Sequence, residues 1–489
     1  MTSQDADDGD AGEAAQPRSL VLRVADNLVL ALFFAPVMLS ALLLGGVRDW
    51  AWAPIAGVIG VVAVLVALGF GAGRGFEISE RERRPLLVLI ACFIVFVAFA
   101  LLQMSSIAPA SGSAWLYAAA LRILGKAHAA VPDIAVDAAR NTLIKCVTCG
   151  LIFLMARAIC RERDRARLLL KLLIAGAVVS VAYGLIMQVT THGCYVGTYV
   201  KKQGEYDLGS YCLMSGTFVN SNSFASYVGM AMVAAIALVL SGRRREPAEG
   251  YDGRPLQKFE AAMTGSRIVL LAIVFFLLGG LLMSASRAGV AASVAGALVL
   301  VVLLMRGQWR ERPDLVRWFV VALVIALVFG LIAGSALLTK AVRAGDSSVR
   351  VAIWLTSLDA IGLSPWLGWG LGSFADIFTI LQPASITQPN NLAHSTPLET
   401  IVELGVIGAI PAFAVVLLPW GICLRGAFRR EYRHRILPVA AFAIVAVPIL
   451  HSMVDFSLQI PAVGYATSAL LGMGWAQAFG RTASTQRRR

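Results

Sequence analysis

Residues 86–104 read LLVLIACFIVFVAFALLQM and contain no charged side chain. The run follows Arg81, Arg83 and Arg84, and a helix needs roughly 20 apolar residues to cross about 30 Å of hydrocarbon. The run is apolar on every side, whereas a strand of a membrane barrel alternates polar and apolar residues. This stretch therefore predicts a transmembrane helix.

Runs of the same kind fill most of the 489 residues. Hydrophobic residues make up 58% of the chain and charged residues 15%, where a soluble domain carries about 25% charged residues. The sequence predicts an all-α polytopic membrane protein with about twelve transmembrane helices between residues 28 and 480. We expect the spans at 28–46, 51–71, 86–104, 141–160, 168–188, 217–240, 268–286, 288–305, 317–337, 404–424, 437–453 and 461–480. Residues 1–27 form an acidic tail that we expect to be disordered, and residues 481–489 form a basic tail.

The distribution of Lys and Arg predicts the orientation. With twelve spans both termini lie on the same side, and placing them in the cytoplasm puts most of the 42 Lys and Arg residues on that side. We therefore expect a multi-pass protein of the bacterial inner membrane. Orientation and anionic lipid account for the net charge of +13, so no nucleic-acid partner is implied.

Three long segments then lie on the periplasmic side. The first, about 105–140, contains Trp115–Ala130, which could form an amphipathic helix in the membrane interface. The second, about 189–216, holds Cys194 and Cys212, which are either joined by a disulfide in the oxidising periplasm or are two free thiols. The third, 338–403, is the longest, and a long ordered loop is usually functional.

The other polar side chains suggest no metal site and no cofactor. Cys146 and Cys149 form a C-x-x-C, but no second pair of ligands accompanies them. The remaining cysteines lie in or beside apolar spans, and the histidines form no H-E-x-x-H pattern.

Two arginines occupy unusual positions. Arg287 stands in S-A-S-R-A-G (284–289), between two apolar spans with almost no loop, where it marks either function or a snorkelling turn residue. Arg350 lies in a segment, 348–362, that looks helical and carries Arg350, Trp354 and Ser357 near one face. Two guanidinium groups on one membrane face suit an anionic ligand such as a diphosphate, because arginine can form two parallel hydrogen bonds to phosphate oxygens.

Several motifs occur in the order that a known family shows. They are G-T-F-V-N-S-N-S-F-A (216–225), S-R-A-G (286–289), Arg350 with Trp354, P-W-L-G-W-G-L-G-S-F (365–374) and A-H-S-T-P-L-E-T-I-V-E-L-G (393–405). This pattern resembles the O-antigen ligase and polymerase superfamily, over about residues 215–425. One departure is Ser395, where many members have Asn after the histidine.

The resemblance implies a GT-C-like glycosyltransferase that uses no metal. Its donor would be a glycan on undecaprenyl diphosphate, and its acceptor a glycolipid or glycan on the periplasmic face. Catalytic roles carry over to Arg287, Arg350 and His394, which otherwise reads as a loop histidine that orders Glu399 or Glu403. We expect further substrate contacts from Asn220, Asn222, Trp354 and Glu399, besides the two arginines.

The acceptor stays open at this point. A ligase would transfer the glycan to lipid A–core, and a polymerase would extend a lipid-linked repeat; we favour the ligase. Protein O-glycosylation and small-anion transport are weaker alternatives, and a transporter should show repeated halves, which the sequence lacks. A purely structural protein would not need Arg287, Arg350 and His394.

Overall fold

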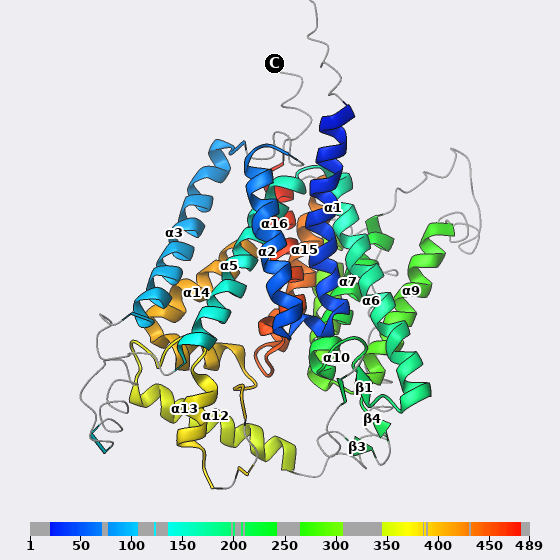
Figure 1. Cartoon of the computed structure of the whole chain (residues 1–489). Helices are drawn as coiled ribbons and strands as arrows, with labels where there is room; N and C mark the ends of the chain where they lie inside the picture. The colour runs from blue at the N-terminus through cyan, green and yellow to red at the C-terminus, as the bar shows by residue number, and fades with distance from the viewer. Residues whose placement is uncertain are drawn as a thin grey trace, which may run out of the picture.

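The computed structural model describes twelve ranges of the chain. They are residues 20–70, 77–105, 122–123, 135–196, 199–200, 207–208, 211–241, 265–306, 345–384, 386–387, 390–429 and 432–480. Within these ranges the protein is a bundle of long helices (Figure 1).

Ten helices of the described residues are long and apolar enough to cross a membrane. They are α1 (Leu20–Leu42), α2 (Asp49–Ala67), α3 (Glu80–Gln103), α5 (Val136–Ile159), α6 (Arg163–Thr191), α7 (Ser221–Ser241), α9 (Gly265–Met283), α10 (Arg287–Met305), α14 (Thr396–Arg429) and α15 (Tyr432–His451). Short 3-10 turns lie at Leu44–Gly46 and Ser457–Gln459. The prediction of a polytopic all-α membrane protein is confirmed.

Eleven of the predicted spans coincide with helices. The predicted span 461–480 is α16 (Pro461–Phe479), while the span 317–337 and nearly all of Trp115–Ala130 lie outside the described residues. One boundary was wrong: α1 begins at Leu20, inside the predicted tail 1–27. Asp26 and Asn27 lie within this helix, so these polar residues do not mark its start.

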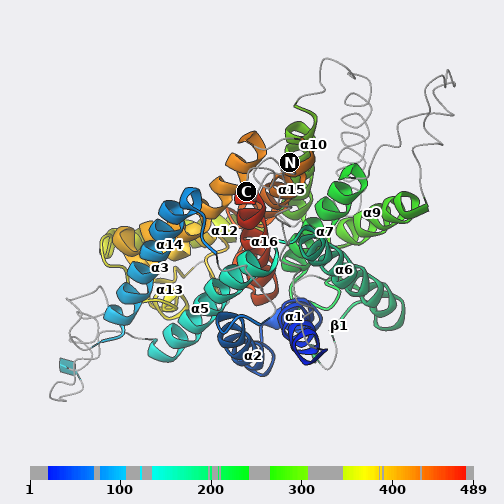
Figure 2. The same ribbon diagram turned by 90° about the horizontal axis from the view of Figure 1, so that it is seen from above.

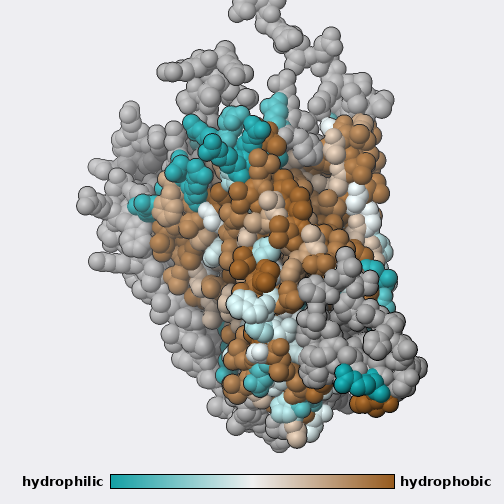
Figure 3. Space-filling view, turned by 90° about the vertical axis from the view of Figure 1, so that its left-hand side faces the viewer, coloured by the Kyte–Doolittle hydropathy of each residue, from teal (hydrophilic) through white to brown (hydrophobic). Residues whose placement is uncertain are grey.

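α16 lies near the middle of the bundle (Figure 2), in contact with α5, α14 and α15. Small residues allow this close packing. A Cβ on Gly472 would lie 2.8 Å from the Cβ of Ala156 on α5. On the outside, apolar side chains form a broad belt bordered above by hydrophilic ones (Figure 3), as expected of a surface that faces lipid.

A buried carboxylate ties three helices together at the end of the bundle where α1 begins. Glu82 of α3 is fully buried, and its Oε1 accepts hydrogen bonds from Arg157 Nε of α5 (2.6 Å) and from Trp475 Nε1 of α16 (2.9 Å). Its Oε2 accepts a hydrogen bond from Arg161 Nη2 (2.8 Å). Both oxygens are thus paired, as a buried charge requires.

The opposite end carries the elements outside the spans. Figure 1 shows α12 (Gly345–Leu363) and α13 (Phe374–Leu381) there, so the long segment 338–403 contains two helices. Two antiparallel strand pairs lie near the end of α6: β1 (Tyr195–Val196) with β2 (Tyr199–Val200), and β3 (Asp207–Leu208) with β4 (Tyr211–Cys212). The structure joins Cys194 to Cys212 by a disulfide, with their Cα atoms 5.0 Å apart, which is the first of the two alternatives above.

Candidate functional site

The glycine-rich loop after α12 packs against a kink in α14 and forms hydrogen bonds with its backbone. Gly368, Gly370 and Gly372 all have positive φ angles (67°, 114° and 78°), and so does Gly405 inside α14 (59°). The loop donates backbone hydrogen bonds from Trp369 N to Val402 O (3.0 Å) and from Gly370 N to Glu403 O (2.9 Å). A Cβ on Gly368 would collide with the backbone of Glu403 and Gly405. The glycines of this loop therefore allow two backbones to touch.

The backbone just before His394 is held from both sides. Trp354 Nε1 of α12 donates to Ala393 O (3.1 Å), and Ala393 N donates to Glu399 Oε2 (2.8 Å). Ala393 and Glu399 are buried, and His394 adopts a left-handed φ of 49°, which is uncommon for a residue with a side chain. Trp354 and Glu399 thus fix the conformation from which the imidazole projects.

His394 faces the segment between α15 and α16. We call residues 451–456 the 451–456 turn. The His394 ring packs edge-on against Phe456, with ring centroids 5.1 Å apart. The next loop residue but one, Thr396, donates its N–H to Ser452 O (2.9 Å) and to Asp455 O (3.2 Å). The histidine loop is therefore docked onto this turn.

Arg350 and Asn222 meet the same turn. Arg350 Nη1 lies 3.5 Å from Val454 O, at the long limit of a hydrogen bond. Asn222 Nδ2 donates to Asp455 Oδ2 (2.6 Å), and Asp455 is buried. Asn220 caps α7, because its Oδ1 accepts from Asn222 N (2.7 Å) and Ser223 N (3.2 Å). The two asparagines of the 216–225 motif thus make contacts within the protein.

The turn that carries Arg287 lies beside the 451–456 turn, because Gly289 approaches His451 closely. Arg287 is the first residue of α10 and is exposed, and Ser286 caps the helix by accepting a hydrogen bond from Gly289 N (3.2 Å). A Cβ on Gly289 would lie 3.3 Å from Cε1 of His451. Four of the five sequence motifs therefore meet the 451–456 turn, three through hydrogen bonds or ring contacts and the S-R-A-G motif through its glycine backbone. The fifth motif, 365–374, contacts α14 instead.

Sequence reasoning missed this turn. His451 is fully buried and lies within electrostatic reach of Arg350, while its Nδ1 is 3.4 Å from Ser457 Oγ. Asp455 joins α7 to the histidine loop. A signal existed, because His451, Ser452 and Asp455 place polar groups at the end of an apolar span, but nothing in the sequence tells what they face.

The candidate site combines arginine side chains with buried carboxyl groups. Arg350 brings a permanent cation, the neighbouring Glu399 and Glu403 are buried on α14, and Arg287 stands exposed at the start of α10. In the part of the chain that the structure describes, no group of three His, Cys, Asp or Glu side chains could hold a metal ion. The arrangement offers a guanidinium and an imidazole, both partly exposed, at the end of the bundle that carries α12 and α13.

Comparison with known proteins finds a family match in the middle of the chain. Residues 272–413 match the family described as O-Antigen ligase. The matched part includes Arg287, Arg350, the glycine-rich loop and His394. No curated protein matches the chain. The resemblance drawn from the motifs is thereby confirmed.

Proposed function

Because residues 272–413 match the family described as O-Antigen ligase, we propose that this chain is a membrane glycosyltransferase of the ligase type. It transfers a glycan from undecaprenyl diphosphate to a lipid A–core acceptor. The reaction takes place in the inner membrane, on the periplasmic face that carries α12 and α13. Both termini then lie in the cytoplasm.

One observation carries the proposal: Arg350 and His394 contact the same six-residue turn, with the S-R-A-G turn beside it. These residues are separated by many positions in the chain, and a merely structural loop has no need to gather them. Glycan transfer from a diphosphate needs a cation to stabilise the leaving phosphate and a base to take the proton of the acceptor. Arg350 and His394 would supply these two groups at one place.

The proposed chemistry is a single displacement. An acceptor hydroxyl oxygen attacks the anomeric carbon while the bond from that carbon to the phosphate oxygen breaks. His394 accepts the hydroxyl proton, because an imidazole is a suitable base near neutral pH. The bonding electrons leave with undecaprenyl diphosphate, whose negative charge Arg287 and Arg350 stabilise. Attack opposite the leaving group inverts the anomeric centre.

The neighbouring residues act mainly through position. Trp354 and Glu399 hold Ala393, the residue before His394. Asn222 fixes Asp455, whose backbone carbonyl accepts from Thr396 of the same loop. Asn220 caps the helix that carries Asn222. We propose that their substrate contacts, where they occur, are secondary to this role.

Lysine and alanine variants separate binding from chemistry. Lysine keeps the charge of Arg350 but loses the planar fork, so Arg350→Lys should lose about 10²–10³-fold in turnover. His394→Ala should lose about 10²–10⁴-fold yet still bind undecaprenyl diphosphate. Arg287→Lys should behave like Arg350→Lys.

The matched control is Arg140→Lys, which alters a 61% exposed arginine paired with Asp137. Turnover and lipid-diphosphate binding are measured for each variant in nanodiscs. Normal turnover of His394→Ala would make the histidine a structural residue. Wild-type diphosphate binding by both arginine variants would place the donor elsewhere.

The acceptor class needs a separate experiment. The glycolipids of a deletion strain are compared with those of the parent strain. Full-length lipid-linked chains that never reach the core would identify a ligase. Accumulation of single unpolymerised repeats would identify a polymerase and overturn this part of the proposal.

A further inference from the structure

α12 lies across the end of the bundle that carries the candidate site (Figure 1). Near the start of this helix, Arg350 Nη1 lies 3.5 Å from Val454 O, in the 451–456 turn that follows α15. Just beyond its end, Leu367 O accepts a hydrogen bond from Nε2 of Gln103, the last residue of α3 (2.8 Å). Both ends of α12 are therefore tied to places where membrane spans end, so the helix lies at about the level of one bilayer surface.

The exposed side of α12 is as apolar as its buried side. Ile353 and Ala360 face inward and are buried. Val351, Leu355 and Leu358 face outward at helical spacing, and each is more than half exposed. The last fifteen residues of the helix contain only two charged side chains. A helix that is apolar on all sides is normally removed from water on all sides.

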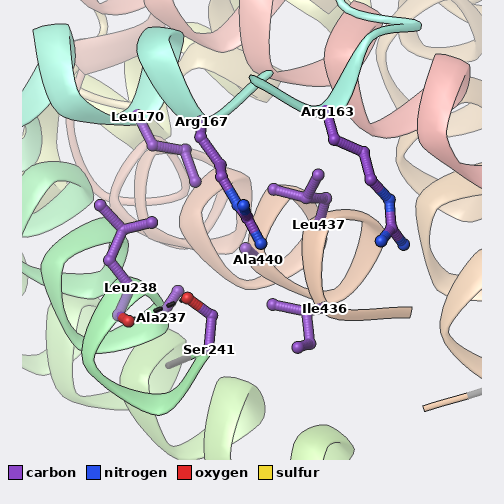
Figure 4. Close-up of a pocket in the computed structure, with 9 residues that line it drawn as sticks. All are labelled: Arg163, Arg167, Leu170, Ala237, Leu238, Ser241, Ile436, Leu437 and Ala440. Carbon is purple, nitrogen blue, oxygen red and sulfur yellow. Dashed lines mark hydrogen bonds between the residues drawn. The ribbon is translucent and has the colours of Figure 1, made fainter. Parts of the chain in front are cut away.

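The start of α6, at the far end of the bundle, shows a helix surface of the opposite kind. Its first turns carry Arg163, Asp164, Arg165 and Arg167. In Figure 4 the side chains of Arg163 and Arg167 extend away from the helix, and Asp164 and Arg167 are exposed. Charges of this kind are what a helix surface in contact with water needs, and the exposed side of α12 has few of them.

The apolar side of α12 adjoins the lipid-facing side of α14. Leu363 and Trp366, both more than half exposed, follow Leu358 along the chain. Ile407 N of α14 donates a hydrogen bond to Trp366 O (3.2 Å), so the two residues lie side by side. Ile407 and Ile410 are exposed apolar side chains of a membrane-spanning helix, where lipid is expected to cover them. Tryptophan is also enriched where spans meet the lipid head groups.

The outer face of α12 consists of Val351, Leu355, Leu358 and Leu363, together with Trp366 just after the helix. We propose that this face inserts among the acyl chains of the leaflet at this end of the bundle, so that α12 is an interfacial helix. Its occupant is lipid and not a second copy of the chain, because the face adjoins the lipid-facing side of α14 at the level where the spans end. The inference concerns the membrane contact of α12 and does not depend on the proposed glycan transfer.

Spin labels in nanodiscs measure the depth of single positions on this face. Leu355→Cys and Leu358→Cys are each made in a chain whose five free cysteines are alanine. Electron paramagnetic resonance compares how often the label collides with oxygen, which concentrates in lipid, and with a water-soluble nickel chelate. We expect both labels to lie about 5–10 Å into the boundary between head groups and acyl chains.

The matched control is Thr379→Cys on α13, at the same end of the protein. Thr379 is exposed and follows the exposed Asp376 by one turn, so its label should collide mainly with the nickel chelate. Nickel collisions at positions 355 and 358 as frequent as at position 379 would mean that the face lies in water, and would overturn the proposal. Labels that are immobile and collide with neither reagent would mean that protein covers the face, and would overturn the lipid assignment.

A second pair of variants tests whether the face itself holds the helix in the membrane. With the label at position 355, adding Leu358→Gln should shift the label toward water and raise its collision rate with the nickel chelate. Adding Ile380→Gln on α13 should leave the label where it was, although Ile380 and Leu358 are exposed to the same extent. An equal shift in both variants, or no shift with Leu358→Gln, would contradict insertion through this face.

Discussion

Replacing Glu82 by glutamine should destabilise the whole bundle. The variant keeps the size of the side chain but removes the charge that faces Arg157, whose side chain is only 3% exposed. The amide also presents N–H groups where Arg157 and Arg161 already donate. A buried guanidinium would then lack its counter-charge.

The structure sets the size of the effect. Removing one partner of a buried ion pair costs about 3–5 kcal/mol, because the other charge stays buried without compensation. Arg161 softens this cost, since its side chain is 29% exposed and water can reach it. At about 2 °C per kcal/mol for a large domain, the melting temperature should fall by roughly 6–10 °C.

Thermal unfolding in detergent, followed by tryptophan fluorescence, measures the shift. Glu80→Gln is the matched control, because Glu80 lies on the same helix and is exposed; its melting temperature should stay near that of the wild type. The double variant Glu82→Leu with Arg157→Leu should recover at least half of the loss, since it removes the uncompensated charge. A Glu82→Gln protein that melts with the wild type would refute the reasoning.

Four further outcomes are expected. A cysteine introduced at the exposed Ile380 on α13 should react with a membrane-impermeant reagent from the periplasmic side, and labelling from the cytoplasm alone would reverse the topology. Mass spectrometry of non-reduced protein should find Cys194 linked to Cys212, and the bond should contribute roughly 3 kcal/mol for a loop of 18 residues; two separately alkylated thiols would contradict this. Excess EDTA should leave transfer unchanged if the arginines alone stabilise the leaving diphosphate, and activity restored by Mg²⁺ would argue against that account. Trp354→Phe, which removes the hydrogen bond to Ala393, should lower turnover about fivefold without weakening donor binding, and an equal loss of donor binding would mean that Trp354 touches the substrate.

The candidate site shows where prediction from sequence succeeded. The helical segment around Arg350 and the order of the motifs were both accessible from sequence, because each depends on local residues. The side of the membrane for each segment stays a prediction from the cations, which the labelling at Ile380 tests. The boundary of α1 was placed too late, because a few polar residues do not end a helix whose neighbours stay apolar.

The contacts among the motifs could not be predicted in this way. Asn222 and Asp455 are 233 positions apart, and their hydrogen bond exists only because α7 and α15 pack side by side. The same holds for Glu82 and Trp475, which are 393 positions apart. No local pattern encodes such pairs.

The sequence by itself determined that this chain crosses the membrane many times as helices. In a transmembrane helix every backbone N–H and C=O must form its hydrogen bond within that helix. The length of an apolar run is therefore enough to predict a transmembrane helix. Only the tertiary structure decided that the 451–456 turn gathers the motifs and that Trp354 and Glu399 hold the residue before His394. The reason is physical: helix packing in a bilayer depends on the fit of small residues and on a few buried hydrogen bonds between distant segments, and these are set by the assembled bundle as a whole.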